Sequence, residues 1–178
     1  MSKLETNTID TVSGTTNLVI GSTNTSTITM PSGEVTGHNY PAFYAYRTAG
    51  QSIGDNTVTK VEMNIELFDT DTAYDNSTNY RFTVPSGKAG KYYVGAFARH
   101  GNFTASREAL LIFKNGSNIM QGESGNASSF QTLQASTVAE LSVGDYIELY
   151  GYQNSGSSQT LIGDGLFQSG FFAYRIGA

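Results

Sequence analysis

Apolar residues recur at every second position along much of the chain from residue 40 onward. In the run KVEMNIELF, residues 60–68, Val61, Met63, Ile65 and Leu67 alternate with polar side chains. Successive side chains of a strand point to opposite faces, so this period predicts one surface strand with a buried face and a wet face. Asn-Gly and Gly-Asp pairs at 114–117, 142–145 and 163–165 are typical of hairpin turns between such strands.

No window shows a sustained helical period, so the pattern predicts an all-β antiparallel sandwich, a jelly roll of about eight to ten strands. Four runs, 41–47, 91–97, 146–152 and 170–176, are apolar at both odd and even positions. A two-sheet sandwich needs only one buried face per strand. The surplus Tyr and Phe therefore predict an interface with another protein chain, where these residue types are enriched. The alternative is that some tyrosines lie on the surface with wet hydroxyls.

The first part of the chain has a different character. Residues 1–38 contain five Ser, ten Thr and three Asn but no aromatic residue, and the first aromatic is Tyr40. Short β-branched pieces at 17–20 and 26–30 leave two interpretations: a disordered tail, or a β-rich shaft completed by neighbouring chains. We therefore expect an arm or shaft over residues 1–40 and a head over residues 41–178.

Composition narrows the function classes. The chain has 178 residues, room for one domain and an appendage, and no cysteine, which excludes disulfides, thiolate metal sites and a cysteine nucleophile. A net charge of −5 without a basic patch argues against nucleic-acid binding. No apolar run approaches the ~20 residues of a membrane span, and the N-terminus has no signal-peptide pattern. We expect a soluble protein without membrane insertion.

Five stretches together resemble one family, the globular head domain of complement component one-q, which shares its jelly roll with tumour necrosis factor. They are PAFYAYRT at 41–48, YDNSTNYRFTVPSGKAGKYYVGAF at 74–97, LLIFKNG at 110–116, VGDYIELYGYQ at 143–153 and FQSGFFAY at 167–174. The residues that carry the signature are Tyr74, Asp75, Phe82, Gly90, Gly170 and Phe171.

This resemblance implies a homotrimer built around a threefold axis that is lined by aromatic residues of one sheet. The candidates for that interface are Tyr44, Tyr46, Tyr92, Tyr150, Tyr152, Phe172 and Tyr174. The N-terminal segment is similar to the Thr/Ser/Asn/Gly-rich leaders that precede such heads in structural proteins of tailed bacteriophages. The resemblance therefore implies a virion protein that is made in the host cytoplasm, docks on other virion proteins through residues 1–40 and exposes its head on the particle surface.

Three functions are compatible with this reading. The head is expected to act as a tail-fibre tip that binds a host surface glycan or protein through loops within 100–106, 122–131 and 153–165. A capsid decoration protein that stabilises the phage head is the first alternative. A secreted bacterial lectin or adhesin is the second, although it needs an export route that the N-terminus does not show.

No catalytic constellation is apparent, so an enzyme is not expected. The histidines are His38 and His100, and His100 is expected in a loop. Glu62 and Glu66 are expected on the solvated face of one strand. No cofactor is expected, with one alternative.

That alternative is a calcium loop. Asp69, Asp71 and Asp75, with Asn76, are closely spaced. Calcium needs six to eight oxygen ligands, and an EF-hand needs flanking helices and a Glu at its twelfth position. Here strands are expected on both sides and that Glu is missing, so turn formation is the simpler interpretation.

Overall fold

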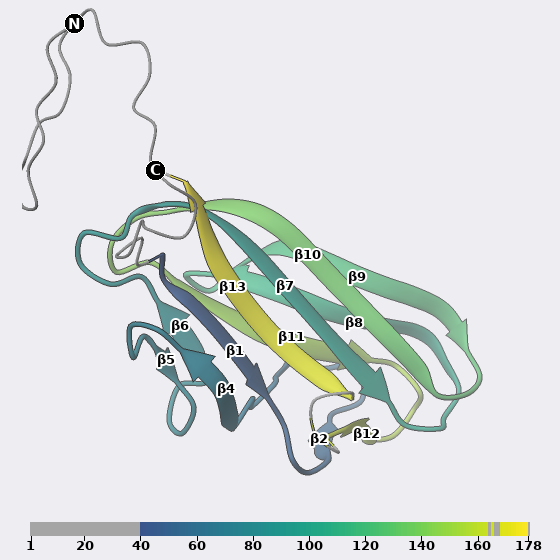
Figure 1. Ribbon diagram of the computed structural model, residues 1–178. Helices are drawn as coiled ribbons and strands as arrows, with labels where there is room; N and C mark the ends of the chain where they lie inside the picture. The colour runs from purple at the N-terminus through teal and green to yellow at the C-terminus, as the bar shows by residue number, and fades with distance from the viewer. Residues whose placement is uncertain (1–39, 164, 166–167, 178) are drawn as a thin grey trace, which may run out of the picture. The chain divides into compact units, whose positions relative to one another are not determined.

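Two antiparallel sheets make up the head, as Figure 1 shows for the computed structural model, which describes residues 40–163, 165 and 168–177. The chain divides into two units, Met1–His38 and Asn39–Ala178. Within the described residues there are thirteen strands and no helix, so no helix there could cross a membrane. The arm or shaft predicted for residues 1–40 lies, apart from Tyr40, outside the described residues.

The first sheet, called sheet A, contains seven strands. Its order is β2 (Gln51–Ile53), β12 (Gln159–Ile162), β7 (Gly90–His100), β13 (Ser169–Gly177), β1 (Ala42–Tyr46) and β4 (Ile65–Asp69), with β10 (Gln131–Leu141) also paired to β7. Because β10 and β13 both pair with β7 along most of its length, they lie on its two opposite edges.

The second sheet, sheet B, contains six strands. Its order is β5 (Tyr74–Asp75), β6 (Arg81–Thr83), β11 (Tyr146–Gln153), β8 (Ala105–Lys114) and β9 (Ser117–Ala127), with β3 (Thr59–Lys60) also paired to β11. The predicted all-β antiparallel sandwich is confirmed. The strand count exceeds the expected eight to ten because five of the strands are only two to four residues long.

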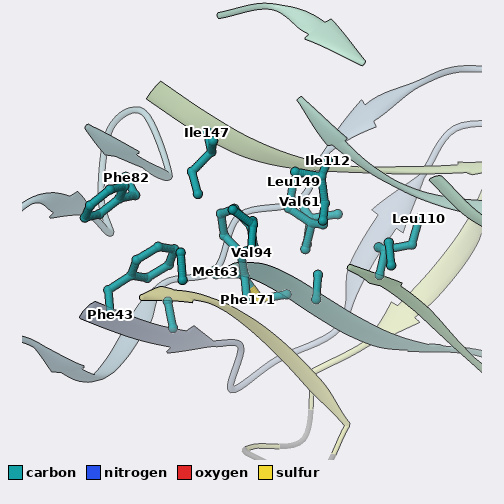
Figure 2. Packing of buried hydrophobic residues seen from close by; sticks show 14 of the residues in the cluster. Phe43, Val61, Met63, Phe82, Val94, Leu110, Ile112, Ile147, Leu149 and Phe171 are labelled. Carbon is teal, nitrogen blue, oxygen red and sulfur yellow. The ribbon is translucent and has the colours of Figure 1, made fainter. Parts of the chain in front are cut away.

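The core lies between the sheets, where alternate residues of long strands such as β7, β11 and β13 point inward (Figure 2). At one end Phe43 is fully buried and stacks on Tyr74 and Phe82, with ring centroids 4.7 Å and 5.0 Å away. Phe171 meets the Phe43 ring edge-on at 5.2 Å. Three of the predicted signature residues, Tyr74, Phe82 and Phe171, therefore join the two sheets through one aromatic cluster.

The run 60–68 does not form the single surface strand that its alternation predicts. Lys60 ends β3 in sheet B, Ile65 begins β4 in sheet A, and the residues between them cross from one sheet to the other. Val61 and Met63 are fully buried, whereas Leu67 is exposed. The period-two pattern persisted because the crossing segment also directs alternate side chains into the core, with the Val61 amide donating to the Leu149 carbonyl at 2.8 Å.

The two long edge strands of the sandwich meet at a glycine. A Cβ atom on Gly122 of β9 would lie 1.7 Å from the Gln134 carbonyl oxygen of β10, so only glycine permits this approach.

At the other edge of sheet A, β4 carries a β-bulge: Tyr44 pairs with Phe68 and Ala45 with Glu66, leaving Leu67 as the extra residue. A bulge at a free edge discourages pairing with foreign strands.

An aromatic face on sheet A as the candidate interaction site

Six of the aromatic side chains on the outer face of sheet A come from four adjacent strands. They form what we call the aromatic face: Tyr44, Phe68, Tyr93, Phe97, Phe172 and Tyr174. Tyr44 and Phe172 stack at 5.7 Å with ring planes 4° apart, and Phe68 lies 6.4 Å from Tyr44. Tyr93 continues the row at 6.3 Å from Phe172 and 5.4 Å from Tyr174. None of the six is buried, so a continuous ring surface faces outward.

Two glycines let the phenyl rings of this face lie flat. Phe172 is directly opposite Gly95, and Phe97 is directly opposite Gly170, on the neighbouring strands β13 and β7. A Cβ atom on Gly95 would lie 2.5 Å from the Phe172 ring, and one on Gly170 would lie 2.5 Å from the Phe97 ring. Each ring thus covers the strand position where a side chain is missing. Gly170, a predicted signature residue, has a packing role here.

Several tyrosine hydroxyls away from the aromatic face are held by hydrogen bonds within the protomer. Tyr74 donates to the Met63 carbonyl at 3.1 Å, Tyr92 to the Lys88 carbonyl at 2.6 Å and Tyr152 to Asn56 Oδ1 at 2.6 Å. Three tyrosines of the aromatic face, Tyr44, Tyr93 and Tyr174, have hydroxyls with no hydrogen-bond partner among the described residues. Buried tyrosine hydroxyls ordinarily find a partner, so burying this face calls for acceptors or donors from elsewhere. Partial burial already raises the pKa of Tyr44.

The outer face of sheet B is covered by the protein's own cations. The Arg81 guanidinium lies 4.3 Å from the Tyr146 ring centroid, and the Arg107 guanidinium lies 4.9 Å from that of Tyr152. Lys60 Nζ lies 5.8 Å from the Tyr150 ring and 2.6 Å from Glu148 Oε1. These tyrosines are therefore partnered on their ring faces within one chain. Burial, together with the Glu148 charge, raises the pKa of Tyr150 to about 12.

The seven residues predicted for the interface do not share one surface. Tyr44, Phe172 and Tyr174 lie on the aromatic face, and Tyr46 follows on the same side of β1. Tyr150 and Tyr152 lie on sheet B.

The prediction for Tyr92 is wrong. Its side chain is 0 % exposed in the protomer's own core, where it lies 5.8 Å from Phe82, and so has no surface to offer a second chain. The desolvation of its hydroxyl raises the pKa of Tyr92 to about 12.

Sequence reasoning missed Phe68, Tyr93 and Phe97. A signal for two of them was present in β7, where charged Lys91 and Arg99 occupy odd positions. Val94 and the alanines fill the even positions with fully buried apolar side chains. Since charged residues mark the outward side, Tyr93 and Phe97 share the outer face with them.

The acidic loop between β4 and β6 is a set of turns. Asp75 Oδ1 accepts from the Ser77 and Thr78 amides at 3.0 Å and 2.9 Å, and Oδ2 accepts from the Asn79 amide and side chain at 3.0 Å and 2.7 Å. These bonds hold the pKa of the Asp75 carboxyl well below its usual range.

The other aspartates of this loop also bind locally. Asp69 accepts from the Asp71 and Tyr74 amides at 3.2 Å and 2.7 Å, and Asp71 accepts from the Thr70 hydroxyl at 2.7 Å. No group of three or more His, Cys, Asp or Glu side chains converges within the described residues. The turn-forming role accounts for the spacing that suggested calcium.

His100 is not a loop residue, contrary to the prediction. It ends β7, is 1 % exposed, and its Nδ1 lies 3.5 Å from Oε2 of the fully buried Glu108. Glu66 also departs from expectation, because it is half-buried in β4, and burial is the main cause that raises its pKa, followed by Asp69 and Asp75. Glu62 is exposed as expected but precedes the strand.

Comparison with known proteins identifies the fold. No family model and no curated protein matches the chain. Among solved structures, the globular domain of zebrafish complement 1qA protein superimposes with a TM-score of 0.55 at 18 % identity, covering 76 % of this chain and 97 % of that one. Eiger TNF from S. frugiperda gives 0.60 at 6 % identity, covering 78 % and 93 %. Murine APRIL at pH 8.0 gives 0.60 at 10 % identity, covering 78 % and 100 %.

These likenesses define the class. The head has the jelly-roll fold of the complement one-q globular domain and of tumour necrosis factor-like proteins, as the sequence stretches predicted.

Proposed function

We propose that this protein is a non-enzymatic, homotrimeric virion protein of a tailed bacteriophage, whose jelly-roll head forms a receptor-binding tip of the tail fibre. The observation that carries the proposal is the aromatic face of sheet A. Five of its rings form a chain of contacts from Phe68 through Tyr44, Phe172 and Tyr93 to Tyr174. Together with three tyrosine hydroxyls that lack a partner in the described residues, this aromatic surface is more than a solitary soluble head needs.

The two sheets support assembly through sheet A. Interfaces are enriched in Tyr and Phe, and their buried centres are depleted of charge. The aromatic face is rich in Tyr and Phe, and on β7 its charges, Lys91 and Arg99, stand beyond the rings near the strand ends. The outer face of sheet B instead carries Arg81, Lys60 and Arg107 over its rings. The resemblance to the complement one-q family supports three copies around an axis lined by aromatic residues.

A binding role is favoured over catalysis. The pair of His100 and Glu108 is sealed in the protomer, so no substrate reaches it. In the acidic loop, the carboxylates of Asp69 and Asp75 accept from backbone amides, and that of Asp71 accepts from the Thr70 hydroxyl. The neighbours by fold are a complement domain and tumour necrosis factor-like proteins, and likeness of this kind supports a head that binds rather than one that reacts.

Binding would use one end of the head, which we call the apical end. Three turns meet there: 101–104 between β7 and β8, 128–130 between β9 and β10, and 154–158 between β11 and β12. The predicted recognition loops 100–106, 122–131 and 153–165 include these turns, although much of their length belongs to strands. The phage context is supported by the Thr/Ser/Asn/Gly-rich composition of residues 1–40.

Light scattering after gel filtration tests the assembly. We expect the full chain to have three times the protomer mass, and Phe172→Asp to reduce it to one, because a buried carboxylate without a partner is strongly unfavourable. Tyr152→Asp, on sheet B beside Arg107, is the matched control and should remain trimeric. A wild-type monomer at micromolar concentration would overturn the proposal.

Copy number on the particle tests the location. A receptor-binding tip should be present in few copies and bind host envelopes. A capsid decoration protein should be abundant, and its loss should lower the stability of the phage head. Quantitative gel staining of purified virions separates these two outcomes, and absence of the protein from virions would contradict both.

A further inference from the structure

A hollow interrupts the aromatic face near the edge strand β10. It has a volume of about 280 Å³, and its walls include Tyr93, Phe97 and Phe172. Across the β7–β10 pair, Ser136 is directly opposite Gly95, whereas Tyr93 and Phe97 occupy the outward positions on either side of that glycine. The Phe172 ring covers Gly95 between Tyr93 and Phe97. The hollow beside that ring is a socket walled by the three rings, with the exposed residues Ser136 and Gln134 at its β10 rim.

The opposite edge of the same face carries a ring that projects. Phe68 lies on β4 and is 46 % exposed. Its ring contact is with Tyr44 at 6.4 Å, so it leans on the aromatic face at one side only. Phe68 is thus an exposed phenyl ring at the β4 end of the aromatic face.

Phe68 cannot fill the socket of its own protomer. In sheet A, β7 and β4 are separated by β13 and β1, so at the usual strand spacing their axes lie about 14 Å apart. A phenyl side chain is far shorter than that. If the socket receives Phe68, the ring must come from a second copy.

Ring symmetry favours such a pairing. In a closed assembly of three, each protomer uses two different patches, because self-complementary contacts generate twofold pairs instead. A socket at one edge of a face and a projecting ring at the other edge are the two halves of a head-to-tail contact. Resting on the trimer proposed above, we infer that Phe68 of each copy inserts between Tyr93, Phe97 and Phe172 of the next copy.

The test is a set of socket and ring variants measured by analytical ultracentrifugation of the full chain. Ser136→Trp places an indole in the socket and should dissociate the trimer by excluding the incoming ring. Phe68→Ala removes that ring and should raise the trimer dissociation constant at least about tenfold, as expected for an aromatic anchor. In the double variant, the indole takes the volume that Phe68 vacates, so assembly should return toward wild type.

Matched controls lie at the apical end. Phe130 is also a phenylalanine and is 48 % exposed, and Ser129 beside it is an exposed serine. Phe130→Ala and Ser129→Trp should leave the trimer unchanged, and Phe130→Ala should not rescue Ser136→Trp.

The outcomes separate the two proposals. A monomeric wild type defeats the trimer and the insertion together. A trimeric wild type in which Ser136→Trp also assembles, or in which Phe68→Ala fails to restore it, refutes the insertion while the proposed function stands. Circular dichroism of each variant identifies loss of folding, and rescue in the double variant excludes misfolding as the cause of dissociation.

Discussion

Replacing Phe43 with alanine removes the ring at the centre of the cluster that joins the two sheets. Phe43 is fully buried, and its ring contacts Tyr74, Phe82 and Phe171 at 4.7–5.2 Å. A buried phenylalanine removes about 200 Å² from water, which at about 25 cal/mol per Å² gives an upper value of about 5 kcal/mol. Measured Phe→Ala changes in cores are about 3–5 kcal/mol, so both routes agree.

The assay is thermal and urea unfolding followed by circular dichroism at several protein concentrations. A loss of about 3–5 kcal/mol corresponds to a fall in Tm of about 10–17 °C for a head of this size. Assembly makes Tm depend on protein concentration. The effect of the substitution on the protomer itself is therefore the part of the Tm change that is the same at every concentration. Tyr44→Ala is the control, since Tyr44 is the next residue of β1 but points to the aromatic face. A concentration-independent loss for Phe43→Ala no larger than that for Tyr44→Ala would refute the assignment of inward and outward faces.

Three further outcomes follow from local geometry. Gly170→Ala should weaken the proposed trimer in sedimentation while changing protomer unfolding little, because the new Cβ meets the movable ends of two side chains, the Phe97 ring at 2.5 Å and the Tyr44 hydroxyl at 2.6 Å. Unchanged assembly would contradict this. Asp75→Asn should cost about 1–2 kcal/mol at pH 7, by analogy with capping carboxylates. Folding lowers the pKa of the Asp75 carboxyl, so the stability that its hydrogen bonds contribute is present above about pH 4 and is lost as the pH falls further. The unfolding free energies of wild type and Asp75→Asn should therefore converge in acid. A difference that does not change with pH would argue against the role of Asp75 in the turn. Calorimetric titration with millimolar calcium should give no heat, and saturable heat abolished by Asp75→Asn would reverse this reading of the loop.

The strands were predictable because their alternation reflects burial on one side. Part of the aromatic surplus does lie on an outer face, that of sheet A, whereas the interface that it indicates stays a prediction. The parity of paired aromatics was not predictable in the same way: in Tyr92–Tyr93 and Phe171–Phe172 both members are amphipathic or apolar, so hydrophobicity alone does not say which one faces inward. The flanking Lys91 and Arg99 resolve the first pair only when the strand is read over its full length.

Partners distant in sequence explain the other differences. Nothing local to Tyr150 or Tyr152 indicates that Lys60 and Arg107 cover them, because those cations come from β3 and β8. His100 looked like a loop residue beside Gly101, but its burial depends on Glu108, across the turn that joins β7 to β8. Residues 60–68 alternate as a strand should, yet they change sheets midway, which is a property of the fold rather than of the pattern.

The extra residue of β4 has a consequence for how this head can change over evolutionary time. The free edge next to the aromatic face is irregular because Leu67 is inserted, and no special side chain is needed to keep it so. Point substitutions at that position preserve the irregularity, since it depends on chain length. Loss of one codon would instead give β4 a regular edge able to pair with the edge of another copy, and such pairing is a route to open-ended polymers.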